Sequence, residues 1–300
     1  MDTAMYNRAG ADELRRRLSC GCLAVQGPMG SLLMSEPFGE DIPAALWNVA
    51  EGATVERLHR LYLAAGAELL ITNTFQANAP ALSRDLVRSS VRNVCDLAVR
   101  HARRASAKLL LGSMGPCGID WFAPGAAEYT AAVAAYREQA LALLEAGVDG
   151  ILLETFTSIR DLEPALVGVH EVLDGMPLAV SFAVDGKAEL LGDHLNIEAA
   201  VRHVQKRGGA DMLGINCCTV EEANSAVPRL LACAEGIPVM VRPNAGMPHR
   251  DEDGALEWDE DPQAMADAAR AWREAGVRAV GGCCGTTPKT TCAVADVLDV

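Results

Sequence analysis

The stretch RAVGGCCGTTP, residues 278–288, contains a complete strand-to-helix corner. Arg278–Gly282 is a short apolar run of the kind that forms a buried strand. Thr287 followed by Pro288 is typical of a helix N-cap and of the first residue of that helix. Glycines surround the cysteine pair between these two signals and give the backbone conformational freedom there. The sequence therefore predicts that a strand ends near the cysteine pair and that a helix begins directly after it.

The same unit of an apolar run and a helical pattern recurs along the whole chain. The other predicted strands are Leu23–Gly27, Glu68–Phe75, Lys108–Gly115, Gly150–Phe156, Pro177–Val184, Met212–Cys217 and Pro238–Asn244. Eight β/α units in about 250 residues match a closed (β/α)8 barrel better than an open doubly wound sheet, which usually has fewer strands. No linker divides the chain, so we expect one TIM-barrel domain over residues 1–300, with an extra helix within residues 1–20. We expect the acidic segment Met247–Asp261 to be a solvated loop.

Composition restricts the classes of function. Half of the residues are apolar, and 26 basic against 40 acidic residues give a net charge of −14. This acidity argues against binding to nucleic acids or anionic membranes, which depends on clustered Lys and Arg. We find neither a secretory signal nor an apolar run long enough to span a membrane, and we expect a cytoplasmic protein. Ten cysteines in such a chain indicate reduced thiols or metal ligands rather than disulfides.

Three cysteines lie where a barrel would bring them together. The carboxyl ends of the strands of a barrel share one mouth, and Cys217 ends the sixth predicted strand while Cys283 and Cys284 end the eighth. Consecutive side chains of a regular strand point to opposite faces, so the pair can share one metal only if the strand ends or bends there. Three thiolates suit Zn²⁺ and leave one coordination position for a substrate. The alternative is a closed structural site with four ligands.

The chemistry that such a site supports is activation of a thiol. Zinc removes the proton from a thiol whose ordinary pKa is about 8.5, and a nucleophilic thiolate results at neutral pH. Alkyl or methyl transfer to that sulfur follows. Hydrolysis by zinc-bound water is the rival, but such sites usually have histidine or carboxylate ligands and a general base. The six histidines lie away from the predicted strand ends, and we interpret them as surface or core residues.

Other polar residues at the predicted strand ends are candidates for binding the substrate. They are Gln26, Asn73, Glu154, Thr155, Asn216 and Asn244. Glu154 could bind an ammonium group of the substrate or pair with a basic residue in the mouth. The three asparagines could instead satisfy backbone groups, and Asn244 could offer its amide oxygen to zinc when no thiol is bound. Gln26 could be a turn residue.

Over almost its whole length the chain resembles the zinc-dependent homocysteine S-methyltransferases. The shared motifs are Gly27 with Met29-Gly30, Thr72-Asn73-Thr74-Phe75, Gly112 to Pro116, Glu154-Thr155-Phe156, Gly214-Ile215-Asn216-Cys217, Pro243-Asn244-Ala245-Gly246 with Pro248, and Gly281 to Pro288. The resemblance implies a barrel, zinc on Cys217, Cys283 and Cys284, and methyl transfer to homocysteine that yields methionine. The motif after the seventh strand looks most like the homocysteine-binding domain of cobalamin-dependent methionine synthase.

Two departures from this pattern affect the expected substrates. The sequence contains only the homocysteine-binding unit, so we expect the methyl group to come from methylcobalamin on a separate corrinoid protein, or from a small donor such as S-methylmethionine. The family has Asp-Gly where this chain has Gln26-Gly27, and that aspartate helps to hold the substrate's ammonium group. Glutamine supplies no charge, so the ammonium is bound more weakly or the thiol is a different one. A non-catalytic subunit that binds zinc or a thiol is the remaining alternative.

Overall fold

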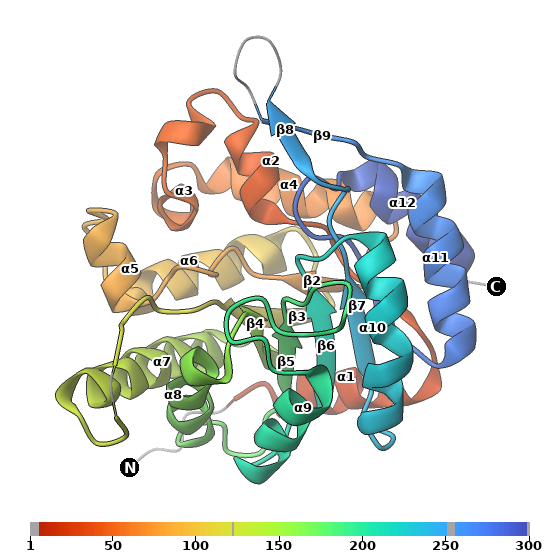
Figure 1. Ribbon diagram of the computed structural model, residues 1–300. Helices are drawn as coiled ribbons and strands as arrows, with labels where there is room; N and C mark the ends of the chain where they lie inside the picture. Colours follow the sequence, from red (N-terminus) through yellow and green to blue (C-terminus); the bar gives the residue numbers. More distant parts are fainter. Residues whose placement is uncertain (1–5, 122, 251–255, 299–300) are drawn as a thin grey trace.

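The computed structural model describes residues 6–121, 123–250 and 256–298, and it shows a barrel of eight parallel strands surrounded by helices (Figure 1). The barrel strands are β1 (Leu23–Ala24), β2 (Leu69–Ile71), β3 (Leu109–Met114), β4 (Gly150–Phe156), β5 (Leu178–Phe182), β6 (Met212–Asn216), β7 (Val239–Arg242) and β10 (Ala279–Val280). They are hydrogen-bonded in the order β1-β10-β7-β6-β5-β4-β3-β2. A parallel bridge between Val25 and Leu69 joins the two ends of this order and closes the barrel. The predicted barrel is confirmed.

Helices connect the strands and form the outer layer. They are α1 (Arg8–Cys20), α2 (Met29–Met34), α3 (Ala44–Ala50), α4 (Gly52–Ala64), α5 (Ala79–Arg84), α6 (Val91–Arg104), α7 (Ala127–Ala146), α8 (Ile159–His170), α9 (Ile197–Lys206), α10 (Val220–Cys233), α11 (Pro262–Ala275) and α12 (Pro288–Leu298), with a 3-10 turn at Gly39–Asp41. Hydroxyl side chains cap several of them, as Ser158 does for α8 and Thr219 for α10. Among the described residues, no helix is both long enough and apolar enough to cross a membrane.

Two apolar cores hold the barrel together. One lies between the strands and the outer helices and includes the fully buried Tyr62, Tyr136 and Phe156. The other fills the interior of the barrel with residues from all eight strands and two leucines of α1. Its members are Leu14, Leu18, Leu23, Val25, Leu69, Ile71, Leu109, Leu111, Leu152, Ala179, Met212, Met240 and Ala279. Because side chains alternate between the two faces of a strand, each longer strand contributes to both cores.

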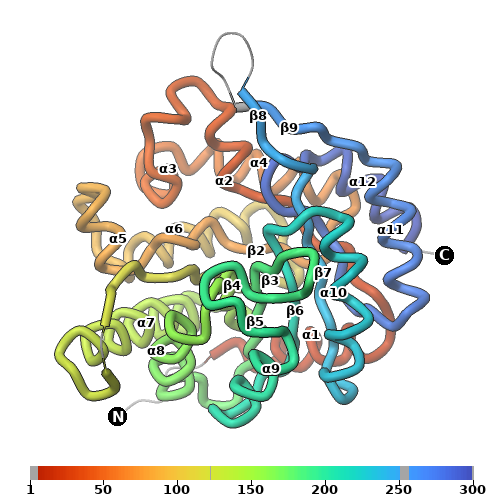
Figure 2. Tube along the Cα trace, in the orientation of Figure 1, coloured from red at the N-terminus to blue at the C-terminus, as the bar shows by residue number. Residues whose placement is uncertain are grey.

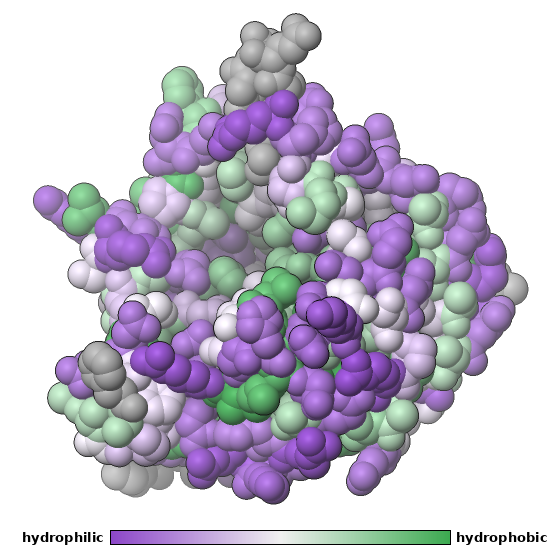
Figure 3. Space-filling view, viewed as in Figure 1, coloured by the Kyte–Doolittle hydropathy of each residue, from purple (hydrophilic) through white to green (hydrophobic). Residues whose placement is uncertain are grey.

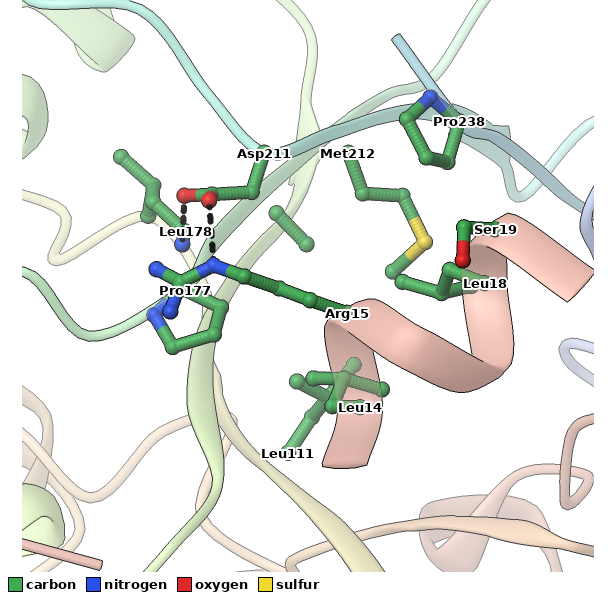
Figure 4. Close-up of a pocket in the computed structure, with 11 residues that line it drawn as sticks. Leu14, Arg15, Leu18, Ser19, Leu111, Pro177, Leu178, Asp211, Met212 and Pro238 are labelled. Carbon is green, nitrogen blue, oxygen red and sulfur yellow. Dashed lines mark hydrogen bonds and ion pairs between the residues drawn. The ribbon is translucent and has the colours of Figure 1, made fainter. Parts of the chain in front are cut away.

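The predicted N-terminal helix is present as α1, and it closes the amino-terminal end of the barrel. Figure 4 shows Leu18 of α1 beside Met212 and Leu14 beside Leu111, around a cavity of about 170 Å³. At the edge of this cavity Arg15 forms an ion pair with Asp211, with 3.1 Å between nitrogen and oxygen. The opposite end of the barrel, where the carboxyl ends of the strands lie, is the end that a functional site would use.

The prediction of a solvated loop over Met247–Asp261 was wrong in part, and residues 251–255 of that segment lie outside the described residues. Two short strands, β8 (Pro248–Arg250) and β9 (Leu256–Trp258), pair in antiparallel register there. This ribbon stands beside α2, at the rim of the mouth (Figure 2). Strands this short give no clear periodic signal in the sequence. The acidic residues after β9 also have structural tasks: Glu260 accepts a hydrogen bond from the backbone N–H of Thr287 at the start of α12, at 2.6 Å.

Candidate active site

The three predicted cysteine ligands converge at the carboxyl end of the barrel. The sulfur of Cys217 lies 3.1 Å from that of Cys283 and 3.9 Å from that of Cys284. All three sulfur atoms lie within 4.8 Å of one another. Cys217 directly follows β6, while Cys283 and Cys284 follow β10, so segments far apart in the sequence contribute to one cluster.

Local backbone geometry turns the three sulfurs toward one point. Cys217 has a left-handed backbone with φ of 56°, which redirects its side chain at the end of β6. β10 ends at Val280, before the cysteine pair, and the amide of Thr286 donates to the carbonyl of Cys283 at 3.1 Å. Gly285 has φ of 79° in this turn, a conformation that favours glycine. The cysteine pair therefore lies in a turn, where consecutive side chains need not alternate.

The loop after β7 holds both cysteine segments. The amide of Cys283 donates to the carbonyl of Pro243 at 2.7 Å, and the amide of Ala245 donates to the carbonyl of Cys284 at 2.9 Å. Between them, the amide of Asn244 donates to the carbonyl of Cys218 at 2.8 Å. The amide oxygen of Asn244 is buried and has no hydrogen-bond partner among the described residues. An orphaned oxygen in this loop is compatible with a metal ligand.

Contacts within the cluster shift the pKa values of the three thiols in different directions. Hydrogen bonds from Cys217 and Cys284 hold the pKa of Cys283 well below its usual range, and the nearby charge of Arg242 acts in the same direction. The hydrogen bond with Cys283 raises the pKa of Cys217. For Cys284, the contact with Cys217 lowers the pKa, but Cys283 and burial outweigh it and raise the value to about 12. A divalent cation would allow all three to ionise.

A ring of polar side chains lies above the apolar interior of the barrel. Four members follow an interior apolar residue by two positions and Asn216 follows Met212 by four, so all of them face the interior too. The members, one from each strand from β3 to β7, are Ser113, Glu154, Ser181, Asn216 and Arg242, and all of them are buried. Buried polar groups are costly unless they are hydrogen-bonded, and the members of this ring belong to two hydrogen-bonded networks.

The first network joins Arg242, Glu154 and Ser113. A terminal nitrogen of Arg242 lies 2.6 Å from one carboxylate oxygen of Glu154, and the hydroxyl of Ser113 donates to the other oxygen. Nε of Arg242 also donates to the carbonyl of Gly282, at 3.3 Å, next to the cysteine pair. Glu154 thus pairs with a basic residue in the mouth, which was the alternative to its predicted contact with a substrate ammonium.

The second network runs through Asn216. Its amide oxygen accepts hydrogen bonds from the Ser181 hydroxyl at 2.6 Å and from the backbone N–H of Thr155 at 3.1 Å. Its amide nitrogen donates to the Thr155 hydroxyl at 2.7 Å and contacts the sulfur of Cys283 at 3.8 Å. Thr155 has a left-handed backbone, with φ of 63°, at an irregularity in β4. Asn216 therefore positions two residues of the mouth, Thr155 and Cys283.

A cavity of about 380 Å³ opens onto the sulfurs. Figure 3 shows a hollow on this side of the molecule, with hydrophilic residues around much of its rim. The cavity brings together most of the residues predicted from the sequence: Gln26, Asn73, Glu154, Thr155, Cys217, Cys283 and Cys284. Asn216 and Asn244 do not line it. Asn73 also donates to the carbonyl of Ala44 at 2.7 Å, which ties β2 to α3.

Among the side chains that sequence reasoning missed at this site are Arg242 and His59. Arg242 lines the cavity, and the available signal was a single charged residue at the end of an otherwise apolar strand. His59 was interpreted as remote from the strand ends, but from α4 its Nδ1 lies 3.2 Å from the amide oxygen of Gln26. No local pattern could indicate this contact, because it depends on how α4 packs against β1.

Comparison with known proteins agrees with this geometry. The family model for homocysteine S-methyltransferases matches residues 23–298. The chain belongs to the homocysteine S-methyltransferase family. The expected resemblance is confirmed.

Two mycobacterial relatives and one solved structure show how far the similarity extends. The chain is 32% identical over 301 residues to the methionine synthase of Mycobacterium tuberculosis, covering 96% of this chain and 25% of that protein. It is 35% identical over 246 residues to that of Mycobacterium leprae, covering 78% and 20%. The chain thus spans a quarter or less of these relatives. The metallated form of the Escherichia coli homocysteine methyltransferase MmuM is 25% identical with a TM-score of 0.76, over 94% of this chain and 99% of that one.

Proposed function

We propose that this protein catalyses zinc-dependent methyl transfer to the thiol of homocysteine, giving methionine. The observation that carries the proposal is the group of three cysteine sulfurs within 4.8 Å of one another in the wall of a cavity of about 380 Å³. Three thiolates with room for one more ligand are typical of a catalytic zinc site rather than a structural one.

Zinc fits the residues that are present. Cys217, Cys283 and Cys284 would hold the ion, and the orphaned amide oxygen of Asn244 is a candidate fourth ligand in the absence of a thiol. Zinc would supply the acidity that converts the thiol of the acceptor into a thiolate at neutral pH. All ten cysteines are free thiols, which suits a reducing compartment, so we propose a cytoplasmic location.

The other residues of the cavity would orient the acceptor. We assign Gln26, Asn73 and Thr155 to its amino-acid end, and Glu154 to the same end through its pairing with Arg242, because all of them line the same cavity as the sulfurs. We assign Asn216 to positioning Thr155 and Cys283. In the transfer, the bond between the methyl carbon and the donor breaks, the carbon–sulfur bond of methionine forms, and the donor keeps the electron pair. The thiol proton leaves to solvent when the acceptor binds.

We propose methylcobalamin on a separate corrinoid protein as the donor. The methionine synthases that the chain matches are several times longer than this chain. Large apolar side chains are also exposed in the connections on the mouth side of the barrel, after β1, β2 and β7. They are Phe38, Leu86 and Met247, with 80%, 84% and 68% of their surface exposed. We propose that the corrinoid protein contacts this side of the barrel, because its methyl group has to reach the cavity that the three sulfurs line.

A donor screen tests the proposal. Zinc-loaded protein is mixed with homocysteine and, in turn, with methylcobalamin free or on a corrinoid protein, with S-methylmethionine and with betaine. Methionine is measured by mass spectrometry with a labelled methyl group. We expect methionine with the corrinoid protein, and none after Cys283→Ala. Methionine from none of the donors would overturn the proposal, while turnover with S-methylmethionine alone would change the donor.

A second candidate, a different acceptor thiol, is favoured by one observation. The only carboxylate among the described residues that line the cavity, Glu154, is already paired with Arg242, and Gln26 carries no charge. Zinc-edge X-ray spectroscopy with a panel of thiols tests this candidate, since the true acceptor adds a fourth sulfur to the metal. If homocysteine adds this sulfur at a lower concentration than any other thiol does, the second candidate is excluded.

A further inference from the structure

The carboxylate of Glu154 has little capacity left for a substrate ammonium. Arg242 occupies one of its oxygens and Ser113 the other. An ammonium that approached the first oxygen would come close to the guanidinium of Arg242, and like charges repel strongly where water is excluded. Both side chains are more than nine-tenths buried, so solvent screens this repulsion poorly. The cavity therefore offers a substrate cation no unpaired anion besides the sulfurs.

Gln26 turns its donor side toward the cavity. Its amide oxygen lies 3.2 Å from Nδ1 of His59, and the two form a hydrogen bond. His59 is fully buried, and its Nε2 has no hydrogen-bond partner among the described residues. The tautomer with its proton on Nδ1 leaves only an acceptor unpaired at Nε2, whereas the other tautomer buries an unpaired N–H, which is rarer in proteins. His59 therefore donates, Gln26 accepts, and the amide nitrogen of Gln26 is left to face the cavity.

Two hydrogen-bond donors in the cavity are thus available to a ligand. Within the described residues, nothing accepts a hydrogen bond from the amide nitrogen of Gln26 or from Nη2 of Arg242. Both residues line the cavity together with the three cysteines. A guanidinium and an amide N–H₂ match the acceptor geometry of a carboxylate.

We infer that this site selects its thiol by the carboxylate group, through Arg242 and Gln26, and that a free ammonium group contributes little to binding. The inference rests on the proposed function and deepens it, because it names the chemical group of the acceptor that the protein recognises. Homocysteine carries both groups and remains a substrate. Mercaptocarboxylic acids that lack an amino group, or that carry an acylated one, should also be substrates of this site.

Three thiols separate the two groups. Homocysteine is compared with 4-mercaptobutyrate, which lacks the ammonium, and with 3-aminopropane-1-thiol, which lacks the carboxylate. Binding to zinc-loaded protein is measured by calorimetry. We expect 4-mercaptobutyrate to bind within about threefold of homocysteine, and the aminothiol at least about tenfold more weakly, as for loss of a charged hydrogen bond. The matching S-methyl thioethers, measured on metal-free protein by ligand-observed NMR, should follow the same order.

The outcomes distinguish this inference from the function on which it rests. An aminothiol that binds as tightly as homocysteine, while methionine still forms in the donor screen, overturns the inference alone. Binding of none of the three thiols overturns both. Weak binding of 4-mercaptobutyrate and tight binding of homocysteine would return the main role to the ammonium and also overturn the inference.

Substitutions test the two residues directly. Gln26→Asp adds an anion, and we expect it to improve binding of the aminothiol relative to 4-mercaptobutyrate by at least about tenfold. Gln76→Glu is the matched control, because Gln76 lines the same cavity but donates to the carbonyl of Pro116. We expect it to change the ratio less than about twofold, and an equal effect of both substitutions would contradict a specific role for Gln26.

Arg242 is tested in a background that avoids an unpaired buried charge. The double variant Arg242→Met with Glu154→Gln removes both members of the ion pair, and it should lose the preference for the carboxylate. Arg242→Lys keeps a positive charge and should retain most of it. Circular dichroism establishes that each variant is folded. A folded double variant that still prefers 4-mercaptobutyrate to the aminothiol by about tenfold would overturn the inference.

Discussion

Arg242 on β7 and Glu154 on β4 form an ion pair of 2.6 Å across the top of the barrel interior, with only 4% and 8% of their side chains exposed. Strands β5 and β6 lie between these two strands in the sheet, so the pair spans the interior rather than joining neighbours. Removing one member of a buried pair leaves an uncompensated charge, whereas removing both can cost little.

We therefore predict strong coupling between these two residues in stability. Arg242→Met and Glu154→Gln should each lower the free energy of unfolding by about 3 kcal/mol, and the double variant by much less than the sum. Urea denaturation of the metal-free proteins at pH 7 measures this. Arg8→Met is the control, because Arg8 pairs with Asp174 in solvent and its loss should cost less than about 1 kcal/mol. Additive losses would contradict the coupling.

The cysteine cluster predicts the zinc content of the protein. Purified protein should contain one zinc per chain, and Cys283→Ala should lose most of it because two thiolates remain. Elemental analysis by mass spectrometry measures the stoichiometry. Cys292→Ala is the matched control: Cys292 is an exposed cysteine of α12, and its substitution should leave the zinc content unchanged. Equal zinc in both variants would place the metal elsewhere.

Burial of His59 predicts a loss of stability in acid. Burial lowers the pKa of His59 to about 3, whereas the unfolded chain has the ordinary value of about 6.5. Between these values the imidazole of His59 binds a proton in the unfolded state but not in the folded state. Burial of His59 therefore costs no stability above pH 6.5, and the free energy of unfolding falls as the pH decreases below that value. We expect His59→Asn to reduce this loss, which is at most about 1.4 kcal/mol per pH unit.

The measurement is denaturant unfolding between pH 7 and pH 4.5. His194→Asn serves as the control, because His194 is exposed and its substitution should leave the slope with pH nearly unchanged. Wild-type and His59→Asn proteins that lose stability in parallel would show that His59 is protonated in the folded state.

The closed end of the barrel predicts a contrast between two adjacent residues of α1. Leu14 is 1% exposed in the interior core, so Leu14→Ala should enlarge the cavity below the barrel and cost about 2–5 kcal/mol. Arg15 pairs with Asp211 at the surface, and Arg15→Ala should cost less than about 1 kcal/mol. Thermal and urea unfolding measure both. Similar small losses would mean that α1 contributes little to the barrel.

The sequence alone determined the barrel and the three cysteines that meet at its mouth. Eight apolar runs, each followed by a helical pattern, leave few alternatives to a closed barrel, because strands buried on both faces must be covered by helices. Once the barrel is assumed, the carboxyl ends of its strands meet at one mouth, so Cys217 and the pair Cys283 and Cys284 could be brought together without coordinates. These inferences depend on periodicity, which is local in the sequence, and on the order of the strands along the chain.

Only the tertiary structure decided how the polar residues of the mouth are paired. Nothing near Glu154 in the sequence indicates Arg242 as its partner, and nothing near Gln26 indicates His59, because these contacts join strands and helices that are distant along the chain. Pairing decides which atoms remain free for a ligand, since a hydrogen-bonded oxygen is no longer available to a substrate. For that reason the chemical class of the site could be inferred from the sequence, while the charge that it offers its substrate could not.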